Sequence, residues 1–174
     1  MIIGERVILR ALERKDLPKM CQWRNDPEGR RFVFSYLPIS QAEEEIWFED
    51  YLKQGKSKVF IIELKEKGVP IGYLLISNID HKNQNAEVGI HLDEKEYQGQ
   101  GLGTDAMRTL LRFLFGEMNL ERVYLYVHDY NERATNFYKK MGFTQEGTLR
   151  KATFTEGRFY DIFLMSILKE EFKD

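Results

Sequence analysis

Three glycines, Gly99, Gly101 and Gly103, lie within five residues near the middle of the chain. They follow an alternating strand pattern and open directly into an amphipathic helical pattern. Glycine lets the backbone approach a ligand closely, and the free N–H groups at a helix start favour an anion. The spacing therefore predicts a backbone cradle for a diphosphate, and with it a cofactor that carries a nucleotide.

Two common nucleotide-binding loops do not fit this segment. A phosphate-binding loop of the Walker type places a lysine after its last glycine, whereas Gly103 is followed by Thr104 and Asp105. A dinucleotide-binding fold carries its glycine motif after the first strand, whereas this motif lies past the midpoint of the chain. The nucleotide must therefore be held in another fold.

The pattern Gln98-x-x-Gly101-x-Gly103 resembles the acyl-CoA pyrophosphate loop of the GCN5-related N-acetyltransferase (GNAT) superfamily. Residues 86–92 resemble the central strand of that family, and residues 131–143 resemble its second cofactor motif. Residues 86–166 are similar to the branch that holds ribosomal-protein N-terminal and spermidine acetyltransferases, while the first 85 residues match it more loosely.

The resemblance implies acetyl-CoA as cofactor, an amine as acceptor and no metal ion. It also implies which residues contact the cofactor: Leu92, Gln98, Gly99, Gln100, Gly101, Leu102, Gly103, Thr104, Asn131 and Tyr138. Thr104 and Asn131 also suit the start of their helices, Asn131 as an N-cap, so both roles stay open for them. Arg133, Lys139 and Lys140 could meet the 3′-phosphate of the nucleotide or simply be solvated.

Amide formation from a thioester needs a neutral amine, a donor to the carbonyl oxygen and a proton for the leaving thiolate. A phenol with a pKa near ~10 can protonate a thiolate, and the resemblance makes Tyr138 this general acid. The same helical spacing also suits a core aromatic residue. Backbone N–H groups near Leu92 are the resource that the family uses for the oxyanion.

Glu87 is the candidate general base, acting through water. It lies eleven residues before Gln98, an offset that matches the catalytic glutamate of the superfamily's histone acetyltransferases. A solvated strand carboxylate is the simpler interpretation of the same residue. Asp161 and His128 are the alternative bases.

Hydrophobic periodicity and capping residues predict one α/β (α+β) domain over residues 1–174. We expect four helices, near residues 16–23, 40–54, 103–116 and 131–141, and an irregular segment over 25–38. We expect seven strands in a mixed, mostly antiparallel sheet: 6–12, 58–64, 70–79, 85–92, 123–127, 143–150 and 159–168. The resemblance adds that the strands carrying Glu87 and Tyr126 splay apart to form the slot for the acyl-CoA arm.

Composition limits the classes of partner. The formal charge of −2 argues against nucleic acid, and no apolar run approaches the ~20 residues of a membrane-spanning helix. Cys21 is the only cysteine, and the first residues lack the pattern of a signal peptide, so we expect a cytoplasmic protein. A homodimer is expected from the habit of the family alone.

The acceptor amine is the least determined part of the prediction. Residues 13–57 carry nearly equal numbers of acids and bases, which favours a peptide or protein N-terminus over a polyamine such as spermidine. A cluster of acids on residues 40–54 could face a polyamine, but a solvated helix face is the preferred interpretation. This cluster comprises Glu43, Glu44, Glu45, Glu49 and Asp50.

Two further alternatives stay open. Five aromatic residues could line a site for an amino sugar, although a core beneath the first two helices is preferred. They are Trp23, Phe32, Phe34, Tyr36 and Trp47. A protein that binds acetyl-CoA as a sensor without turnover would carry the same cofactor motifs.

Overall fold

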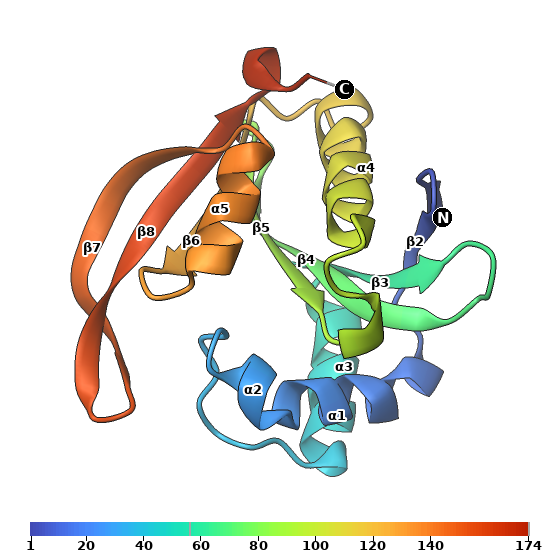
Figure 1. The fold of residues 1–174 in the computed structure, drawn as a ribbon. Helices are drawn as coiled ribbons and strands as arrows, with labels where there is room; N and C mark the ends of the chain where they lie inside the picture. The colour runs from blue at the N-terminus through green and yellow to red at the C-terminus, as the bar shows by residue number, and fades with distance from the viewer. Residues whose placement is uncertain (56, 174) are drawn as a thin grey trace.

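A twisted eight-stranded sheet organises the molecule in the computed structural model, which describes residues 1–55 and 57–173 (Figure 1). The strand order is β1-β2-β3-β4-β5-β6-β8-β7, and every neighbouring pair is antiparallel except β5 and β6. The strands are β1 (Ile2–Ile3), β2 (Val7–Ala11), β3 (Lys58–Leu64), β4 (Pro70–Asp80), β5 (Asn85–Leu92), β6 (Arg122–His128), β7 (Thr144–Thr155) and β8 (Arg158–Leu168).

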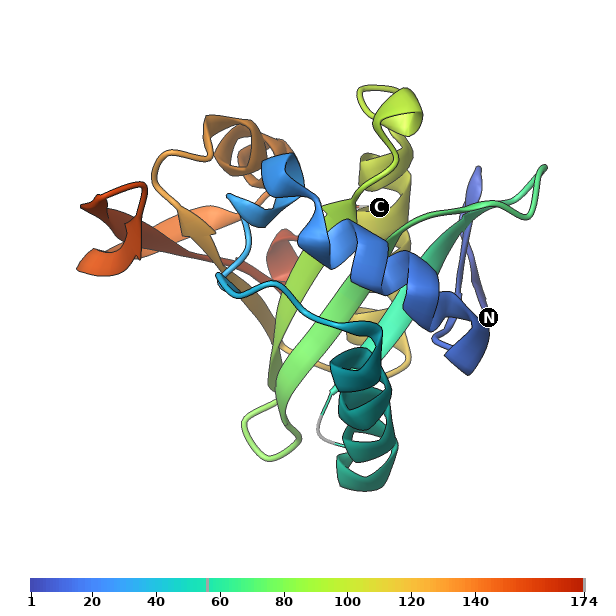
Figure 2. The same ribbon diagram turned by 90° about the horizontal axis from the view of Figure 1, so that it is seen from below.

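Helices cover both faces of this sheet. Helices α4 and α5 pack on one face, and α1 and α3 pack on the other (Figures 1 and 2). The helices are α1 (Leu17–Asn25), α2 (Pro27–Arg30), α3 (Gln41–Gln54), α4 (Leu102–Gly116) and α5 (Glu132–Lys140).

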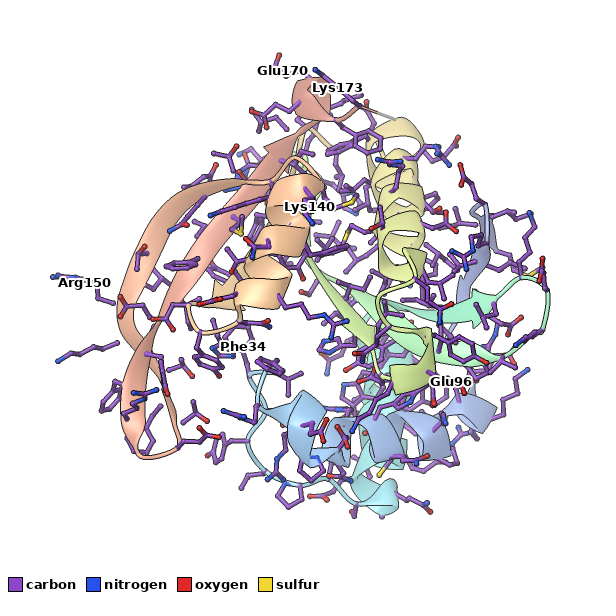
Figure 3. The ribbon with its side chains drawn as sticks, in the orientation of Figure 1. Phe34, Glu96, Lys140, Arg150, Glu170 and Lys173 are labelled. Carbon is purple, nitrogen blue, oxygen red and sulfur yellow. The ribbon has the colours of Figure 1, made fainter. Side chains whose placement is uncertain are left out.

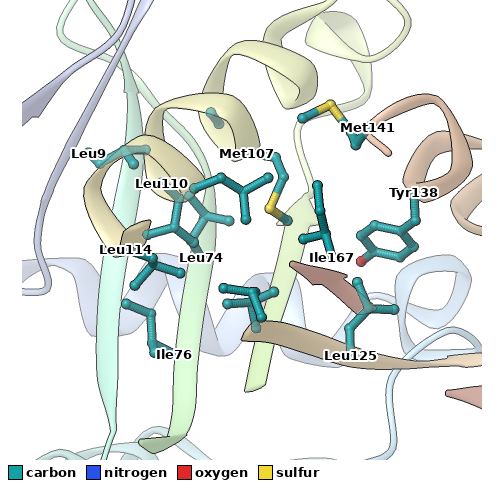
Figure 4. Close-up of a cluster of buried hydrophobic side chains, with 14 of the residues drawn as sticks. Leu9, Leu74, Ile76, Met107, Leu110, Leu114, Leu125, Tyr138, Met141 and Ile167 are labelled. Atoms are coloured by element: carbon teal, nitrogen blue, oxygen red, sulfur yellow. The ribbon is translucent and has the colours of Figure 1, made fainter. Parts of the chain in front are cut away.

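The alternation of side chains along the strands builds two cores. Ile62 and Leu74 point to the α4 side and join the larger core, whereas Ile61 and Tyr73 point to the α1 and α3 side. Met107 of α4 and Tyr138 of α5 meet the strands in the larger core (Figure 4). The sheet is thus held rigidly from both faces, which fixes the positions of its strand ends.

The predicted fold class, one α/β domain around a mixed and mostly antiparallel sheet, is confirmed. The structure adds the two-residue strand β1 and extends β7 to Thr155. It also corrects the segment expected to be irregular, because Pro27–Arg30 forms the short helix α2. Asp26 caps α2 by accepting a hydrogen bond from Gly29 N (2.8 Å). One turn is too short to show a helical period in sequence.

The expectation that five aromatic residues form a core is wrong for three of them. Phe32, Phe34 and Tyr36 are 45%, 55% and 79% exposed, whereas Trp23 is buried. Phe34 instead packs on His128, with ring centroids 4.5 Å apart, at the point where the segment after α2 approaches β6 (Figure 3).

No helix among residues 1–55 and 57–173 has the length and apolar content needed to cross a membrane.

Candidate active site

Strands β5 and β6 separate after a short paired stretch, and we call the interval between them the slot. The two parallel strands pair only from Asn85–Arg122 to Glu87–Tyr124. Beyond this point β5 continues to Leu92 and β6 to His128 without pairing, so each strand offers unpaired backbone groups to whatever lies between them. The splayed arrangement expected for these strands is present, with α4 and α5 on one side of it (Figure 1).

The glycine loop lies at the end of β5. Gly99 and Gly101 have φ values of +76° and +81°, and a Cβ added at either position would meet no atom within 4 Å. The first hydrogen bond of α4 runs from Asp105 N to Gly101 O (3.0 Å), so the N–H groups of residues 102–104 have no partner within the helix. An open backbone surface with free donors fits the diphosphate of coenzyme A.

Gly103 has a different role from its two neighbours. Its φ is helical, and a Cβ there would lie 2.7 Å from Leu92 Cδ1. Glycine at this position therefore lets α4 pack closely against β5. Its side is taken up by Leu92, while its N–H remains one of the free donors at the start of α4.

Gln98 connects the two sides of the slot. Its Nε2 donates to Leu92 O (2.7 Å), and its Oε1 accepts from Arg133 Nη1 of α5 (2.8 Å). Arg133 therefore lies beside the phosphate loop. Lys139 and Lys140 are six and seven residues further along α5, a distance of about 10 Å at 1.5 Å per residue, and Figure 3 places Lys140 at the far end of this helix.

Helix α5 presents the two other predicted cofactor residues. Asn131 caps this helix by accepting from Ala134 N (3.1 Å). Tyr138 is buried, and its ring points from α5 toward Leu125 of β6 (Figure 4). Burial raises the pKa of Tyr138, so the phenol stays protonated at neutral pH and can act as a donor.

The three candidate bases have different surroundings. Glu87 accepts a hydrogen bond from Asn78 Nδ2 (2.8 Å) at the paired end of β5. The Asp161 carboxylate accepts from Lys151 N (2.8 Å) in the β7–β8 hairpin. His128 is 2% exposed and stacks on Tyr130, with ring centroids 4.9 Å apart. Burial lowers the pKa of His128.

A pocket of about 580 Å³ opens on the α1 side of the sheet, next to the end of β5. Four carboxylic acids line it, against one base, Lys95. The acids are Asp26, Asp93, Glu94 and Glu96. We call this the acidic pocket.

The acids of α3 point elsewhere. Glu44 is fully buried and pairs with Arg24 of α1 (3.0 Å), while Glu45 and Glu49 both pair with Arg14. Glu43 closes the capping box with Ser40. These acids therefore hold α3 against α1 and the short turn before it, or cap the first turn of α3.

A larger pocket of about 620 Å³ lies on the β2–β3 side of the phosphate loop. Arg6 lines it and donates from Nη1 to Gln100 O (2.6 Å), and Lys65, Lys67, Glu5 and Glu66 give it mixed charge. This pocket lies away from the β5–β6 slot, so its size does not make it the reaction site.

Comparison with known proteins decides the family. Residues 6–144 match the model of the acetyltransferase (GNAT) domain. The chain belongs to the GNAT acetyltransferase family. It is an acetyl-CoA-dependent N-acetyltransferase, and the predicted family, cofactor and enzyme class are confirmed.

Relatives of this GNAT protein span nearly its whole length. It is 30% identical over 171 residues to the uncharacterized N-acetyltransferase p20 of Bacillus licheniformis (97% of this chain, 96% of the relative). It is 30% identical over 166 residues to the spermidine N(1)-acetyltransferase of Escherichia coli K12 (95% and 88%). It is 24% identical over 176 residues to the putative ribosomal N-acetyltransferase YdaF of Bacillus subtilis (98% and 96%).

A solved structure agrees with the fold. The spermidine N-acetyltransferase of Vibrio cholerae, crystallised in complex with CoA and spermine, superposes with a TM-score of 0.90 at 28% identity and covers 97% of this chain and 98% of its own.

Sequence reasoning missed the acidic pocket of this acetyltransferase. Asp93 directly follows Leu92, the residue near which the oxyanion donors are expected. Asp26 lies between the C-terminal end of α1 and the start of α2. A signal existed for Asp93, since a carboxylate directly after the cofactor strand must lie near the slot. No sequence signal linked it to Asp26, because only the packing of α1 and α2 joins these distant segments.

Proposed function

We propose that the acetyl acceptor is a linear polyamine of the spermidine class. The observation that carries the proposal is the acidic pocket at the end of β5, where four carboxylic acids oppose one lysine. A polyamine carries two or more ammonium groups at neutral pH, because aliphatic amines have pKa values near ~10. A row of acids beside the slot can bind the distal ammonium groups while one amine enters the slot.

The charge of the acidic pocket is only partly neutralised by protein groups. Glu94 forms an ion pair with Lys19 and accepts a hydrogen bond from Trp23 Nε1 (3.0 Å). Lys95 forms its ion pair with the exposed Glu28 (2.8 Å). Asp26, Asp93 and Glu96 have no ion pair among the described residues. This uneven balance favours a multiply charged cation over an amino sugar or a peptide, each of which offers one ammonium group at the reacting end.

The relatives support the same choice. A protein named as a spermidine acetyltransferase is 30% identical to this chain, and a structural neighbour was crystallised with spermine. The expectation of a peptide N-terminus relied on the near balance of charge over residues 13–57. That balance arises largely from structural ion pairs such as Arg24–Glu44, so it says little about the pocket.

The proposed roles of the slot residues follow the same geometry. Backbone N–H groups at the end of β5, near Leu92, donate to the carbonyl oxygen as it gains charge, and Tyr138 protonates the departing thiolate. The phosphate loop from Gln98 to Thr104 and the N-terminal part of α5, with Asn131, hold coenzyme A. A cytoplasmic location and a homodimer remain predictions.

The test is a turnover assay with an acceptor panel. The protein is incubated with acetyl-CoA and spermidine, a peptide with a free N-terminus, or glucosamine. Free thiol is followed over time, and the product is identified by mass. We expect kcat/KM for spermidine to exceed that for the peptide and glucosamine by at least about 10-fold, a gap of about 1.4 kcal/mol.

A higher kcat/KM for the peptide would overturn the polyamine proposal in favour of N-terminal acetylation. Calorimetric binding of acetyl-CoA without thiol release from any acceptor would instead identify a sensor. A double variant, Asp26→Asn with Glu96→Gln, provides the matched check, since it should raise KM for spermidine more than KM for glucosamine.

A further inference from the structure

Asp93 stands where the cofactor slot meets the acidic pocket. It follows Leu92 directly, and its N–H donates to Ile71 O (3.1 Å), as does the N–H of Glu94 (3.3 Å). These two bonds fix the backbone just beyond β5 against the start of β4. The Asp93 side chain lines the acidic pocket, one residue from the end of β5, so it lies on the side from which we propose that the acceptor enters.

The carboxylate of Asp93 lacks a protein partner on one side. Its Oδ2 atom is buried and makes no hydrogen bond within residues 1–55 and 57–173. A buried polar atom without a partner costs about 1–3 kcal/mol, so a ligand atom that hydrogen-bonds to it would be bound favourably. By contrast, Glu94 is held by Trp23 and Lys19.

Asp26 brings a second carboxylate to the same place. A Cβ added to Gly29 would lie 3.4 Å from Asp26 Oδ2 and 3.7 Å from Asp93 Oδ1. The two carboxylates therefore converge on the bare Cα of Gly29. Two neighbouring acids attract an ammonium group, and they disfavour the simultaneous charging of both.

Burial, Asp26 and Glu94 raise the pKa of Asp93 to about 7. The other titratable groups around this corner include Glu96, the ion-paired Lys19 and Lys95, and Tyr73 of β4 with His91 stacked on it. The pKa of Tyr73 is itself raised by burial and then by Asp93. A carboxylate in this position can both accept and release a proton near neutral pH.

We propose that Asp93 is the general base of the acetyl transfer. The Asp93 carboxylate takes one proton from the acceptor ammonium, R–NH₃⁺, and leaves the neutral amine R–NH₂. The nitrogen lone pair then forms the C–N bond to the thioester carbonyl carbon, and the C–S bond breaks. The thiolate takes a proton from Tyr138, which regains one from the nitrogen, and Asp93 releases its proton to solvent.

This assignment displaces Glu87. Glu87 precedes Leu92 by five residues, which is about 16 Å along a strand at 3.3 Å per residue, and it already accepts from Asn78. Asp93 is one residue from Leu92 and lines the acidic pocket. The assignment rests on an amine acceptor of any class, and it does not require that the acceptor be a polyamine.

The test compares Asp93→Asn and Glu87→Gln over pH 6–10 in the turnover assay, with Glu96→Gln as the control for loss of one pocket charge. The best acceptor found for the wild-type protein is used, whichever class it belongs to. We expect Asp93→Asn to lower kcat by about 10²–10³-fold at pH 7. The loss should shrink as the pH rises toward the pKa of the amine, because the free amine then needs no base.

Asp26→Asn supplies a second readout. Asparagine still caps α2, but the negative charge beside Asp93 is removed, so the acidic limb of the kcat/KM profile should move to lower pH. Acetyl-CoA affinity by calorimetry should match that of the wild type in both variants, which shows that they fold. An acidic limb retained in Asp93→Asn, with kcat within about threefold of the wild type, would overturn the proposal, whether or not spermidine is the acceptor.

Discussion

The glycine motif has two structural roles, which are divided among Gly99, Gly101 and Gly103. The first two adopt positive φ, where an L side chain costs about 1–2 kcal/mol, and face open space. Gly103 is helical and faces Leu92 instead. The motif therefore combines access for a ligand with close packing of the helix that follows.

Gly101→Val should weaken acetyl-CoA binding by about 10-fold or more, because the side chain strains the positive φ and obstructs the diphosphate. Gly157→Val is the matched control, since Gly157 has the same φ of +81° and the same open surroundings in the β7–β8 turn. Calorimetry of both variants checks the prediction. Equal affinities in the two variants would contradict a role of the loop in binding.

Tyr138→Phe should lower kcat by about 10²-fold while acetyl-CoA affinity stays within about twofold, because only the proton donor is lost. Tyr51→Phe is the control, since this phenol accepts from Val59 N (3.3 Å) between α3 and β3, away from the slot. Steady-state kinetics measure the effect. Wild-type turnover in Tyr138→Phe would remove the phenol from the mechanism.

Among the elements, α3 is joined by ion pairs of two kinds to α1 and to the short turn before α1. Glu44 is fully buried against Arg24, and burial raises the pKa of Glu44 against the opposing effect of Arg24. Arg14 pairs with Glu45 and Glu49 at the surface. The buried pair therefore sets how α1 lies on the sheet, and with it the position of Asp26 at the end of α1.

Arg24→Ala should lower the free energy of unfolding by about 3–5 kcal/mol, because it leaves Glu44 buried without a counter-ion. Arg14→Ala should cost about 1 kcal/mol or less, since its pairs are exposed. Both arginines also lie over aromatic rings, so the comparison isolates burial. Urea unfolding measures both values, and similar losses would show that burial of the pair is unimportant.

For the molecule as a whole, the ionisation of Asp93 in the acidic pocket changes the free energy of unfolding. Its pKa rises from 3.8 to about 7 on folding. Between these values the unfolded chain has lost the proton that the folded chain keeps, so the free energy of unfolding falls as the pH rises through this window. Above pH 7 the full loss of stability from ionising the buried Asp93 is present.

Asp93→Asn removes this cost, because asparagine does not ionise. The variant should melt several degrees above the wild type at pH 8, and the gap should close as the pH falls below 4. Thermal melts followed by circular dichroism across this range give the comparison, with the exposed Glu96→Gln as control. Parallel curves for the wild type and Asp93→Asn would show that Asp93 ionises normally.

The sequence alone determined the fold class, the cofactor and most helix and strand bounds. These depend on local signals: the capping box at Ser40, the glycines from Gly99 to Gly103 and the helical period ending at Met141. Such signals are read from neighbouring residues, so the motif and the elements beside it could be predicted together.

Only the tertiary structure decided what surrounds the acceptor. In the folded protein, acids of α3 form ion pairs with Arg14 and Arg24. Asp26 and Asp93, 67 positions apart in the sequence, lie close together beside Gly29. The reason is physical, since the charge and proton affinity of a site depend on which groups burial brings together. The packing of helices α1 and α2 against the end of β5 sets that environment.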